Sequence, residues 1–275
     1  MCKKILLKKI KPIRRLYDIY IASRYFNHKY FKIIKWAFNS NEDTNYTYNL
    51  SNKNKLELLK LFEIIFENVN YEEIKFYLDE IENDHEIKKD IKTRILNSKD
   101  KNFSDLEVYF SRRLGWYLCV RILKPQTVVE TGVDKGLGSL VITKALMKNK
   151  EDGFSGYYYG TDINPDAGYL FSGNYKKFGK ILYGDSIKSL EKIEKEIDLF
   201  INDSDHSADY EYNEYQTIRN KLSKKAIILG DNSHVTDRLL KFSIENNRNY
   251  VFFKEEPLDH WYPGAGIGIS YSKKK

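Results

Sequence analysis

The sequence predicts an α/β protein in which a mainly parallel β-sheet carries helices on both faces. Apolar runs rich in β-branched and aromatic residues recur from residue 127 onward, and segments of helical length separate them. The first five runs end in an acidic or small polar residue, and such residues collect where ligands bind at the carboxyl edge of an open α/β sheet. In chain order the runs are TVVET, YYYGTD, KILYGD, IDLFIND, AIILGD, YVFFKE and GIGISYS.

An α-helical region is expected before this sheet. The polar stretch over residues 39–54 is typical of a loop or linker, and residues 55–96 carry apolar side chains at helical spacing. Residues 104–123 are predicted to form one more helix. Ser104 would cap its N-terminus, and Glu107, three residues later, would complete a capping box.

The positive charge of the chain is concentrated at its N-terminus. Residues 1–40 hold 11 Lys or Arg and one acid, whereas the remaining 235 residues hold 35 bases and 38 acids. Because the main body is nearly neutral, a nucleic-acid groove built into it is disfavoured. These patterns divide the chain into a basic, helical N-terminal region at 1–103 and a sheet-forming domain at 104–275.

The first 40 residues mix basic with apolar and aromatic side chains, and Pro12 interrupts any continuous helix. They could cover the main domain as a solvated helix, contact an anionic membrane surface peripherally, or bind a partner subunit or nucleic acid. No apolar stretch reaches the roughly 18 to 20 residues of a membrane-spanning helix, and the start lacks the apolar core of a secretory signal. Cys2 and Cys119 show no metal-binding spacing, which fits a reduced, cytoplasmic protein.

A glycine-containing loop follows the first predicted strand. Its residues Glu130, Gly132, Gly136 and Gly138 lie between a strand and a helix, where glycine lets the backbone turn sharply and approach a ligand. The spacing is not G-x-G-x-x-G, and the loop lacks the G-K-[ST] of a phosphate cradle. On these residues alone, an ordinary tight turn explains the pattern as well as a ligand site does.

Polar residues at the ends of the next two strands favour a nucleoside site. Asp162 ends the second strand, and an acid at this place is the usual partner of a ribose diol in nucleoside-binding α/β folds. Asp185 and Ser186 follow the third strand, where they could hydrogen-bond an adenine edge. Suitable groups at three successive strand ends are a stronger signal than any one of them.

The motifs ETGVDKGLGS, TDINPD, GDS and DLFINDSDHS, in this order, resemble those of the class I S-adenosylmethionine-dependent methyltransferases. The resemblance covers about residues 105–275 and points, more narrowly, to the small-molecule O-methyltransferases of glycan and natural-product biosynthesis. It implies a Rossmann-like, seven-stranded sheet whose last two strands form an antiparallel pair. The cofactor contacts that it implies are Glu130, Thr131, Gly132, Gly136, Gly138, Ser139, Asp162, Ile163, Asp185, Ser186 and Asp203.

A second polar group is expected after the fourth and fifth strands, which should be neighbours. Its members are Asp203, Asp205, His206, Asp231, Asn232 and His234. Carboxylate and amide oxygens are hard ligands that suit Mg²⁺ with several waters retained, rather than Zn²⁺. A divalent cation would make an acceptor hydroxyl more acidic and orient it toward the methyl group, and an imidazole could then take the proton.

This group also resembles the metal site of the catechol-type methyltransferases. The resemblance implies that Asp203, Asp231 and Asn232 bind Mg²⁺ or another divalent cation. In that family the base is often a Lys three residues after the first ligand; this chain has His206 there, so His206 and Asp203 are the predicted catalytic residues. Simpler roles stay open, namely a helix cap for Asp203 and a turn for Asp231 and Asn232. His206 could equally be a hydrogen-bonded wall residue.

Together these features predict an S-adenosylmethionine-dependent O-methyltransferase, assisted by a divalent metal, that acts on a sugar or glycan intermediate or another small hydroxylated metabolite. The glycan preference rests on the resemblance alone, and a homo-oligomer stays open. The alternatives are a nucleic-acid methyltransferase guided by the basic N-terminus, a non-catalytic S-adenosylmethionine-binding protein, and a dinucleotide dehydrogenase. The chain lacks the Asn/Asp-Pro-Pro-aromatic run of base-methylating enzymes, and its glycine spacing disfavours a dehydrogenase.

Overall fold

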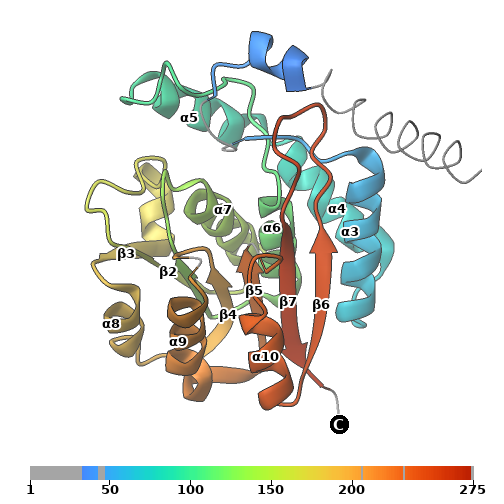
Figure 1. Ribbon diagram of the computed structural model, residues 1–275, viewed down its shortest axis with the longest axis vertical. Coiled ribbons are helices and arrows are strands. Elements are labelled where there is room, and N and C mark those ends of the chain that lie inside the picture. Colours follow the sequence, from blue (N-terminus) through green and yellow to red (C-terminus); the bar gives the residue numbers. More distant parts are fainter. Residues whose placement is uncertain (1–32, 43–46, 206, 232, 274–275) are drawn as a thin grey trace, which may run out of the picture.

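The structure is a computed structural model that describes residues 33–42, 47–205, 207–231 and 233–273. Its centre is a seven-stranded sheet of order β3-β2-β1-β4-β5-β7-β6 (Figure 1). The first five strands run parallel, and β7 lies antiparallel between β5 and β6. The strands are β1 Thr127–Thr131, β2 Tyr157–Asp162, β3 Gly179–Tyr183, β4 Ile197–Asn202, β5 Leu222–Asp231, β6 Arg248–Lys254 and β7 Gly266–Ser272. The predicted fold class, including the antiparallel final pair, is confirmed.

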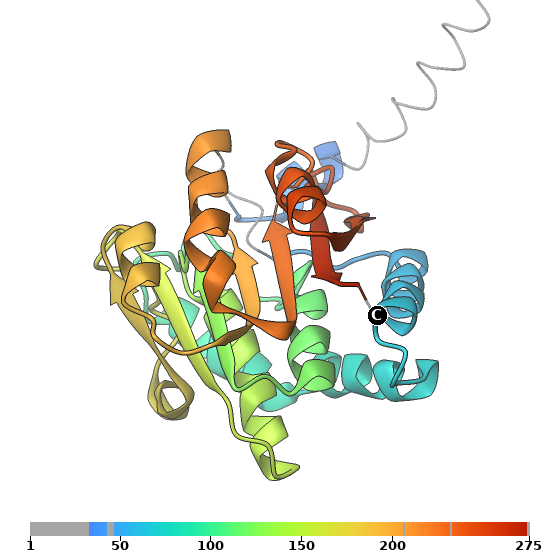
Figure 2. The same ribbon diagram turned by 90° about the horizontal axis from the view of Figure 1, so that it is seen from below.

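Helices precede the sheet and connect its strands. The α-helices are α3 Asn52–Ile65, α4 Tyr71–Glu82, α5 His85–Leu96, α6 Arg113–Leu123, α7 Leu137–Glu151, α8 Ser186–Glu191, α9 Ala208–Ile218 and α10 Arg238–Glu245. Two short 3₁₀ helices are η1 Gly173–Phe178 and η2 Arg219–Lys221. Figure 2 shows helices on both sides of the sheet.

Side chains of the central strands alternate between two separate cores. In β1, Val128 packs with residues of α3 to α7, whereas Val129 packs with residues of α8 to α10. Leu199 and Phe200 in β4 divide in the same way. Because both faces of the sheet are covered, these strands carry apolar side chains on both faces, which made them recognisable as predominantly apolar runs.

The helical pattern predicted over residues 55–96 is present as three helices with separate caps. Asn70 accepts a hydrogen bond from the backbone N–H of Glu73 at the start of α4, and Asp84 accepts one from Ile87 at the start of α5. The buried residues of α3, α4 and α5 belong to the same hydrophobic cluster as one face of the sheet. The N-terminal helices and the sheet are therefore joined by a continuous core.

The helix predicted over residues 104–123 begins later than expected, at Arg113. The hydroxyl of Ser104 is buried and has no hydrogen-bond partner in the described structure, so it caps no helix. Ser111 has a φ of 51°, in the left-handed region, which prevents the helix from extending backward through this residue. The segment before Arg113 is consequently a loop, and the predicted capping box with Glu107 is wrong.

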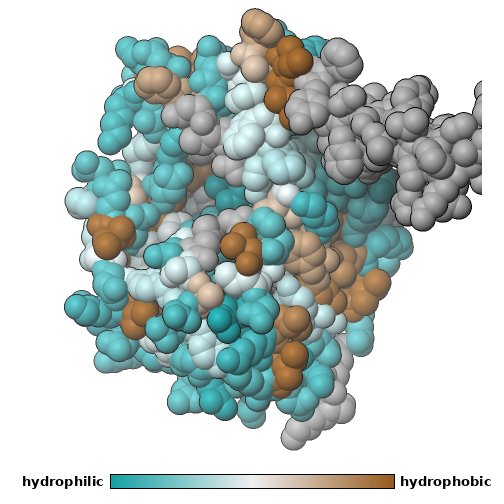
Figure 3. Space-filling view, in the orientation of Figure 1, coloured by the Kyte–Doolittle hydropathy of each residue, from teal (hydrophilic) through white to brown (hydrophobic). Residues whose placement is uncertain are grey.

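The apolarity of the helices and of the surface is relevant to the predicted membrane contact. Of the helices in the described part of the chain, none combines the length and the apolarity needed to cross a bilayer. On the face shown in Figure 3, hydrophilic residues dominate and apolar ones lie in small, separate groups. Residues 1–32, which make up most of the basic N-terminal segment, lie outside the described residues.

Candidate active site

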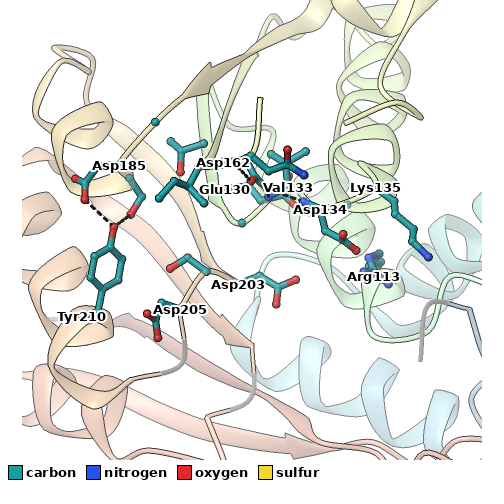
Figure 4. Close-up of a pocket in the computed structure, with 18 of the residues that line it drawn as sticks. Arg113, Glu130, Val133, Asp134, Lys135, Asp162, Asp185, Asp203, Asp205 and Tyr210 are labelled. Atoms are coloured by element: carbon teal, nitrogen blue, oxygen red, sulfur yellow. Dashed lines mark hydrogen bonds between the residues drawn. The ribbon is translucent and has the colours of Figure 1, made fainter. Parts of the chain in front are cut away.

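A cavity of about 620 Å³ opens at the carboxyl ends of the parallel strands (Figure 4). Its volume lies within the roughly 300 to 1,000 Å³ usual for small-molecule and cofactor sites. Eight of the predicted cofactor contacts line it: Glu130, Gly132, Gly138, Asp162, Ile163, Asp185, Ser186 and Asp203. The strand ends on which the sequence placed a nucleoside site therefore meet at one cavity.

The glycine loop after β1 needs its glycines for close packing around the cavity. Gly132 has a φ of +82°, and a Cβ at this position would overlap the backbone carbonyl of Asp203. A Cβ on Gly138 would overlap the carboxylate of Glu130 and the ring of Trp116. These contacts explain why the loop, which lines the cavity, contains glycine at both positions.

Glu130 lies at the buried base of this loop. Its Oε2 accepts a hydrogen bond from Ser139 Oγ at 3.0 Å and another from the hydroxyl of Tyr158. Burial raises the pKa of Glu130 to about 8, although both hydrogen bonds act to lower it. Thr131 and Ser139 are fully buried behind the cavity wall, so they support the loop rather than line the cavity.

Gly136 is the remaining predicted contact that does not line the cavity. It is the N-cap of α7 and has a φ of +91°, so its role is to turn the chain from the loop into the helix. The predicted cofactor set thus separates into residues that form the wall and three residues that hold the wall in place.

Asp162, at the end of β2, organises the same loop. Its Oδ2 accepts hydrogen bonds from the backbone N–H groups of Val133 at 3.0 Å and Asp134 at 2.8 Å. Its Oδ1 accepts one from Asn164 at 2.8 Å. A carboxylate can accept about four hydrogen bonds, so one position remains for a ligand hydroxyl. Figure 4 shows the carboxylate between β2 and the loop.

Tyr210 of α9 connects the two predicted adenine contacts at the opposite end of the cavity (Figure 4). Its hydroxyl lies 2.8 Å from Ser186 Oγ and donates to Asp185 Oδ2 at 3.3 Å. Asp185 also caps α8 by accepting from the backbone N–H of Lys188 at 2.9 Å. Both predicted residues therefore line the cavity in positions fixed by their neighbours.

A buried carboxylate that the sequence analysis missed lies beneath this end of the site. Glu214 on α9 accepts hydrogen bonds from the hydroxyls of Thr131 at 3.1 Å and Ser204 at 2.8 Å. It also accepts from Ser186 Oγ and Asn202 Nδ2. Burial raises the pKa of Glu214 to about 7. This one side chain connects the ends of β1 and β4 with the segments that follow β3 and β4. An acid on the apolar face of a predicted helix was the available signal.

The carboxylates predicted to bind a metal do converge, but they meet at an arginine. Asn202 pairs with Gly230 in the β4–β5 register, which brings Asp203 and Asp231 together at the ends of these strands. Arg112 lies between them: its Nη2 is 3.3 Å from Asp203 Oδ2, and its Nε forms an ion pair with Asp231 Oδ1. Arg112 comes from the loop before α6 and was not among the predicted site residues.

The charges in this group act on one another strongly because the side chains are buried. Burial raises the pKa of Asp231 well above its ordinary value, and Asp203 and Glu255 add to the effect while Arg112 opposes it. Burial alone would lower the pKa of Arg112, but the charges of Asp231 and Asp203 raise it instead. Arg112 therefore stays cationic.

The described residues do not fit a divalent metal at this position. No group of three or more His, Cys, Asp or Glu side chains within the described ranges is arranged to hold one. The two carboxylates that would be ligands are already paired with a guanidinium. The third predicted ligand, Asn232, and the predicted base, His206, lie outside the described residues.

The other polar residues predicted to follow β4 and β5 do not all reach the cavity. Asp203 and Asp205 both line the cavity, whereas His234 lies on an exposed turn after β5. Asp203 is not a helix cap, because α9 begins at Ala208 with Ser207 as its N-cap. The simpler role for Asp203 is therefore wrong.

Comparisons with known proteins agree with this arrangement. Residues 129–233 match the family described as "Methyltransferase domain". A methyltransferase from Geobacter sulfurreducens has a similar structure, with 17% sequence identity, a TM-score of 0.50, and coverage of 74% of this chain and 97% of that chain. An O-methyltransferase from Bacillus cereus in complex with SAH has 14% identity, a TM-score of 0.51, and coverage of 73% and 100%, respectively. Among curated protein sequences, none matches the chain significantly.

The matched segment begins in β1 and ends just after β5, so it contains the glycine loop, Asp162, Asp185 and Asp203. The two solved structures share the fold over nearly their whole length. Residues 129–233 therefore match a methyltransferase domain, and most of the residues that line the cavity at the strand ends lie within this segment.

Proposed function

We propose that the chain is an S-adenosylmethionine-dependent methyltransferase that acts on a hydroxyl group of a small, hydroxylated acceptor, such as a sugar or a glycan intermediate. The observation that carries the proposal is the position of Asp203. Its carboxylate lines the cofactor cavity and contacts Arg112 in the charged group at the ends of β4 and β5. A proton acceptor is thus placed where the donor and a neutral hydroxylated acceptor would meet.

The charges around the cavity support one orientation of the cofactor. Asp162, Asp185 and Tyr210 would face the adenosine half, because hydroxyl and amino groups of a nucleoside are hydrogen-bond donors. Arg113 and Lys135 lie toward the other end of the cavity (Figure 4) and would face the carboxylate of the methionine half. The sulfonium would then lie between these ends, beside Asp203.

The proposed reaction is a displacement at the methyl carbon. The acceptor oxygen attacks this carbon, the carbon–sulfur bond breaks, and its electrons remain on the sulfur of S-adenosylhomocysteine. The hydroxyl proton passes to the carboxylate of Asp203, with His206 as the other predicted base. Metal assistance forms no part of this proposal, because Arg112 lies between the two carboxylates that would bind the ion.

A second cavity, of about 440 Å³, supports a polyhydroxylated acceptor. Its lining combines aromatic rings, including those of Trp36, Tyr48 and His260, with polar and acidic side chains. Tyr48 also donates a hydrogen bond at 2.7 Å to Glu255, whose charge acts on Arg112. Rings offer a surface for the apolar face of a sugar, and carboxylates accept from its hydroxyls.

A nucleic-acid acceptor is disfavoured by the charge of the site. Glu130 is largely protonated near neutral pH, because its pKa is raised to about 8. The other acids that line the cavity, Asp134, Asp162, Asp185, Asp203 and Asp205, still outnumber its three basic residues. A phosphate backbone would be repelled by this excess of negative charge.

For the basic segment at residues 1–40 we propose peripheral contact with anionic membrane surfaces. Binding to anionic liposomes, compared at low and high salt, would test this proposal.

The proposal is tested by transfer of a labelled methyl group. Purified enzyme would be incubated with S-adenosylmethionine carrying a deuterated methyl group and with extracts of sugars, glycans and small metabolites, and the products analysed by mass spectrometry. We expect the label on an oxygen atom of a small hydroxylated product, and its loss with Asp203→Asn. Label on nucleic acid, or an unchanged yield with Asp203→Asn, would contradict the proposal.

A further inference from the structure

Arg112 is built into the site rather than placed on its surface. Its side chain is only 9% exposed, and the side chains of Asp203 and Asp231 are 13% and 0% exposed. The backbone carbonyl of Arg112 accepts a hydrogen bond at 2.9 Å from the N–H of Gly115, which fixes the arginine to the first turn of α6. The preceding residues Phe110 and Ser111 are also buried, so this segment has little freedom to move the guanidinium away.

A guanidinium at this place is incompatible with a divalent ion between the same two carboxylates. Mg²⁺ requires oxygen ligands at about 2.0 to 2.1 Å in near-octahedral geometry, so an ion bound by these two carboxylates would lie beside the guanidinium that already contacts one oxygen of each. Two cations would also lie within a few ångströms of each other in a buried site, where their repulsion is poorly screened.

We propose that Arg112 is the cation of the acceptor site, so that methyl transfer needs no divalent metal. This inference rests on the proposed function, since it assigns the acceptor side of the same site. Arg112 holds Asp203 and Asp231 in place, and it lines the cofactor cavity. A guanidinium has five N–H donors in a rigid plane, and the two ion pairs engage only Nε and Nη2. The remaining donors can bind the acceptor oxygen and stabilise negative charge on it.

The proposal predicts that removal of Arg112 creates a metal site where the native chain has none. We would titrate Mn²⁺ into the folded full-length protein and follow the free ion by electron paramagnetic resonance. The wild-type chain should take up no stoichiometric Mn²⁺. Arg112→Ala, which removes the cation paired with Asp203 and Asp231, should bind Mn²⁺ at least about a hundredfold more tightly, because a unit charge about 4 Å away is removed.

Arg113→Ala is the matched control, because it removes the same charge one residue away from Arg112, the residue that forms the ion pairs with Asp203 and Asp231. It should bind Mn²⁺ no better than the wild type. If Arg112→Ala unfolds, the wild-type titration remains decisive together with Asp231→Asn. One Mn²⁺ bound by the wild-type chain and lost with Asp231→Asn would overturn the proposal.

A second measurement separates this inference from the proposed function. Binding of S-adenosylhomocysteine and label transfer by wild-type enzyme would be compared before and after removal of divalent ions by EDTA. Equal transfer in both samples supports the role of Arg112, and transfer that EDTA abolishes and Mg²⁺ restores would overturn it. A chain that binds S-adenosylhomocysteine but transfers label to no hydroxyl in either sample would contradict the proposed function, while the Mn²⁺ titration would still decide the place of the metal.

Discussion

Glu130 and Gly138 are in such close contact that the carboxylate of the first fills the space where a Cβ of the second would lie. The position of the Glu130 carboxylate is fixed by Tyr158 and Ser139, whose hydroxyls donate hydrogen bonds to its other oxygen. The contact joins the end of β1 to the first turn of α7, and both residues line the cavity at the strand ends. The residue at position 138 therefore affects the shape of the cavity wall.

Gly138→Ala should weaken the binding of S-adenosylhomocysteine. The new methyl group must displace either the carboxylate or the ring of Trp116, at a cost of about 1 to 3 kcal/mol for overpacking in a well-packed site. Calorimetric titration of the folded variant would measure the loss, which should be about fivefold to 150-fold in affinity for that energy. Gly153→Ala is the control, because Gly153 has no atoms within 4 Å of the added Cβ and lies outside the cavity. Its φ of +89° would make the alanine lower the stability of the fold rather than the affinity for the ligand. Equal affinities for both variants would show that this contact does not shape the site.

Asp162→Ala should have a comparable effect for a different reason. It leaves the backbone N–H groups of Val133 and Asp134 without their acceptor and removes the proposed partner of the ribose. Together, the loss of these hydrogen bonds and of the ribose contact should cost about 1 to 3 kcal/mol. The titration with S-adenosylhomocysteine measures the change, and Asp166→Ala, an exposed acid four residues later, is the control. Unchanged affinity for Asp162→Ala would place the nucleoside elsewhere.

Glu214 makes stability depend on pH. Burial raises its pKa from 4.5 to about 7, so the folded state holds this proton more tightly than the unfolded chain. Its contribution to stability is fully present below pH 4.5 and is lost as the pH rises through 7, by at most about 3 kcal/mol. Glu214→Gln cannot titrate, so its unfolding free energy, measured in urea at several pH values, should fall less between pH 5 and 8.

The exposed Glu191→Gln is the control for this pH series and should keep the wild-type slope. Because four donors point at the carboxylate, Glu214→Gln should also be less stable at every pH. Only the slope reports on the titration. A slope equal to that of the wild type would mean that the buried carboxyl does not titrate in this range.

The sheet was predictable from the sequence because its central strands are buried on both faces. TVVET and YYYGTD coincide with β1 and β2, and the polar residues after each strand lie at one edge because the strands are parallel. Asp162, Asp185 and Asp203 could therefore be placed at one site before any contact was known. The same logic brought Asp203 and Asp231 together.

The residues that could not be predicted act through contacts distant in the sequence. Arg112 is 91 positions before Asp203 and lies in a loop whose course depends on the left-handed conformation at Ser111. The Ser104 and Glu107 spacing favoured a helix start at Ser104. Nothing in the neighbouring sequence indicated that the helix begins only at Arg113. One signal in the sequence pointed toward Arg112. Several acids collect at the strand ends, buried carboxylates need a counter-charge, and the sequence contains the adjacent pair Arg112 and Arg113.

Calorimetric titration of the purified chain with S-adenosylhomocysteine tests the central claim most directly. The claim is that the cavity at the ends of β1 to β4 binds the methyl donor. We expect one molecule bound per chain, with the affinity reduced by Asp162→Ala and by Gly138→Ala but not by Asp166→Ala. A folded chain that binds no S-adenosylhomocysteine, or whose binding is indifferent to all three substitutions, would contradict the claim.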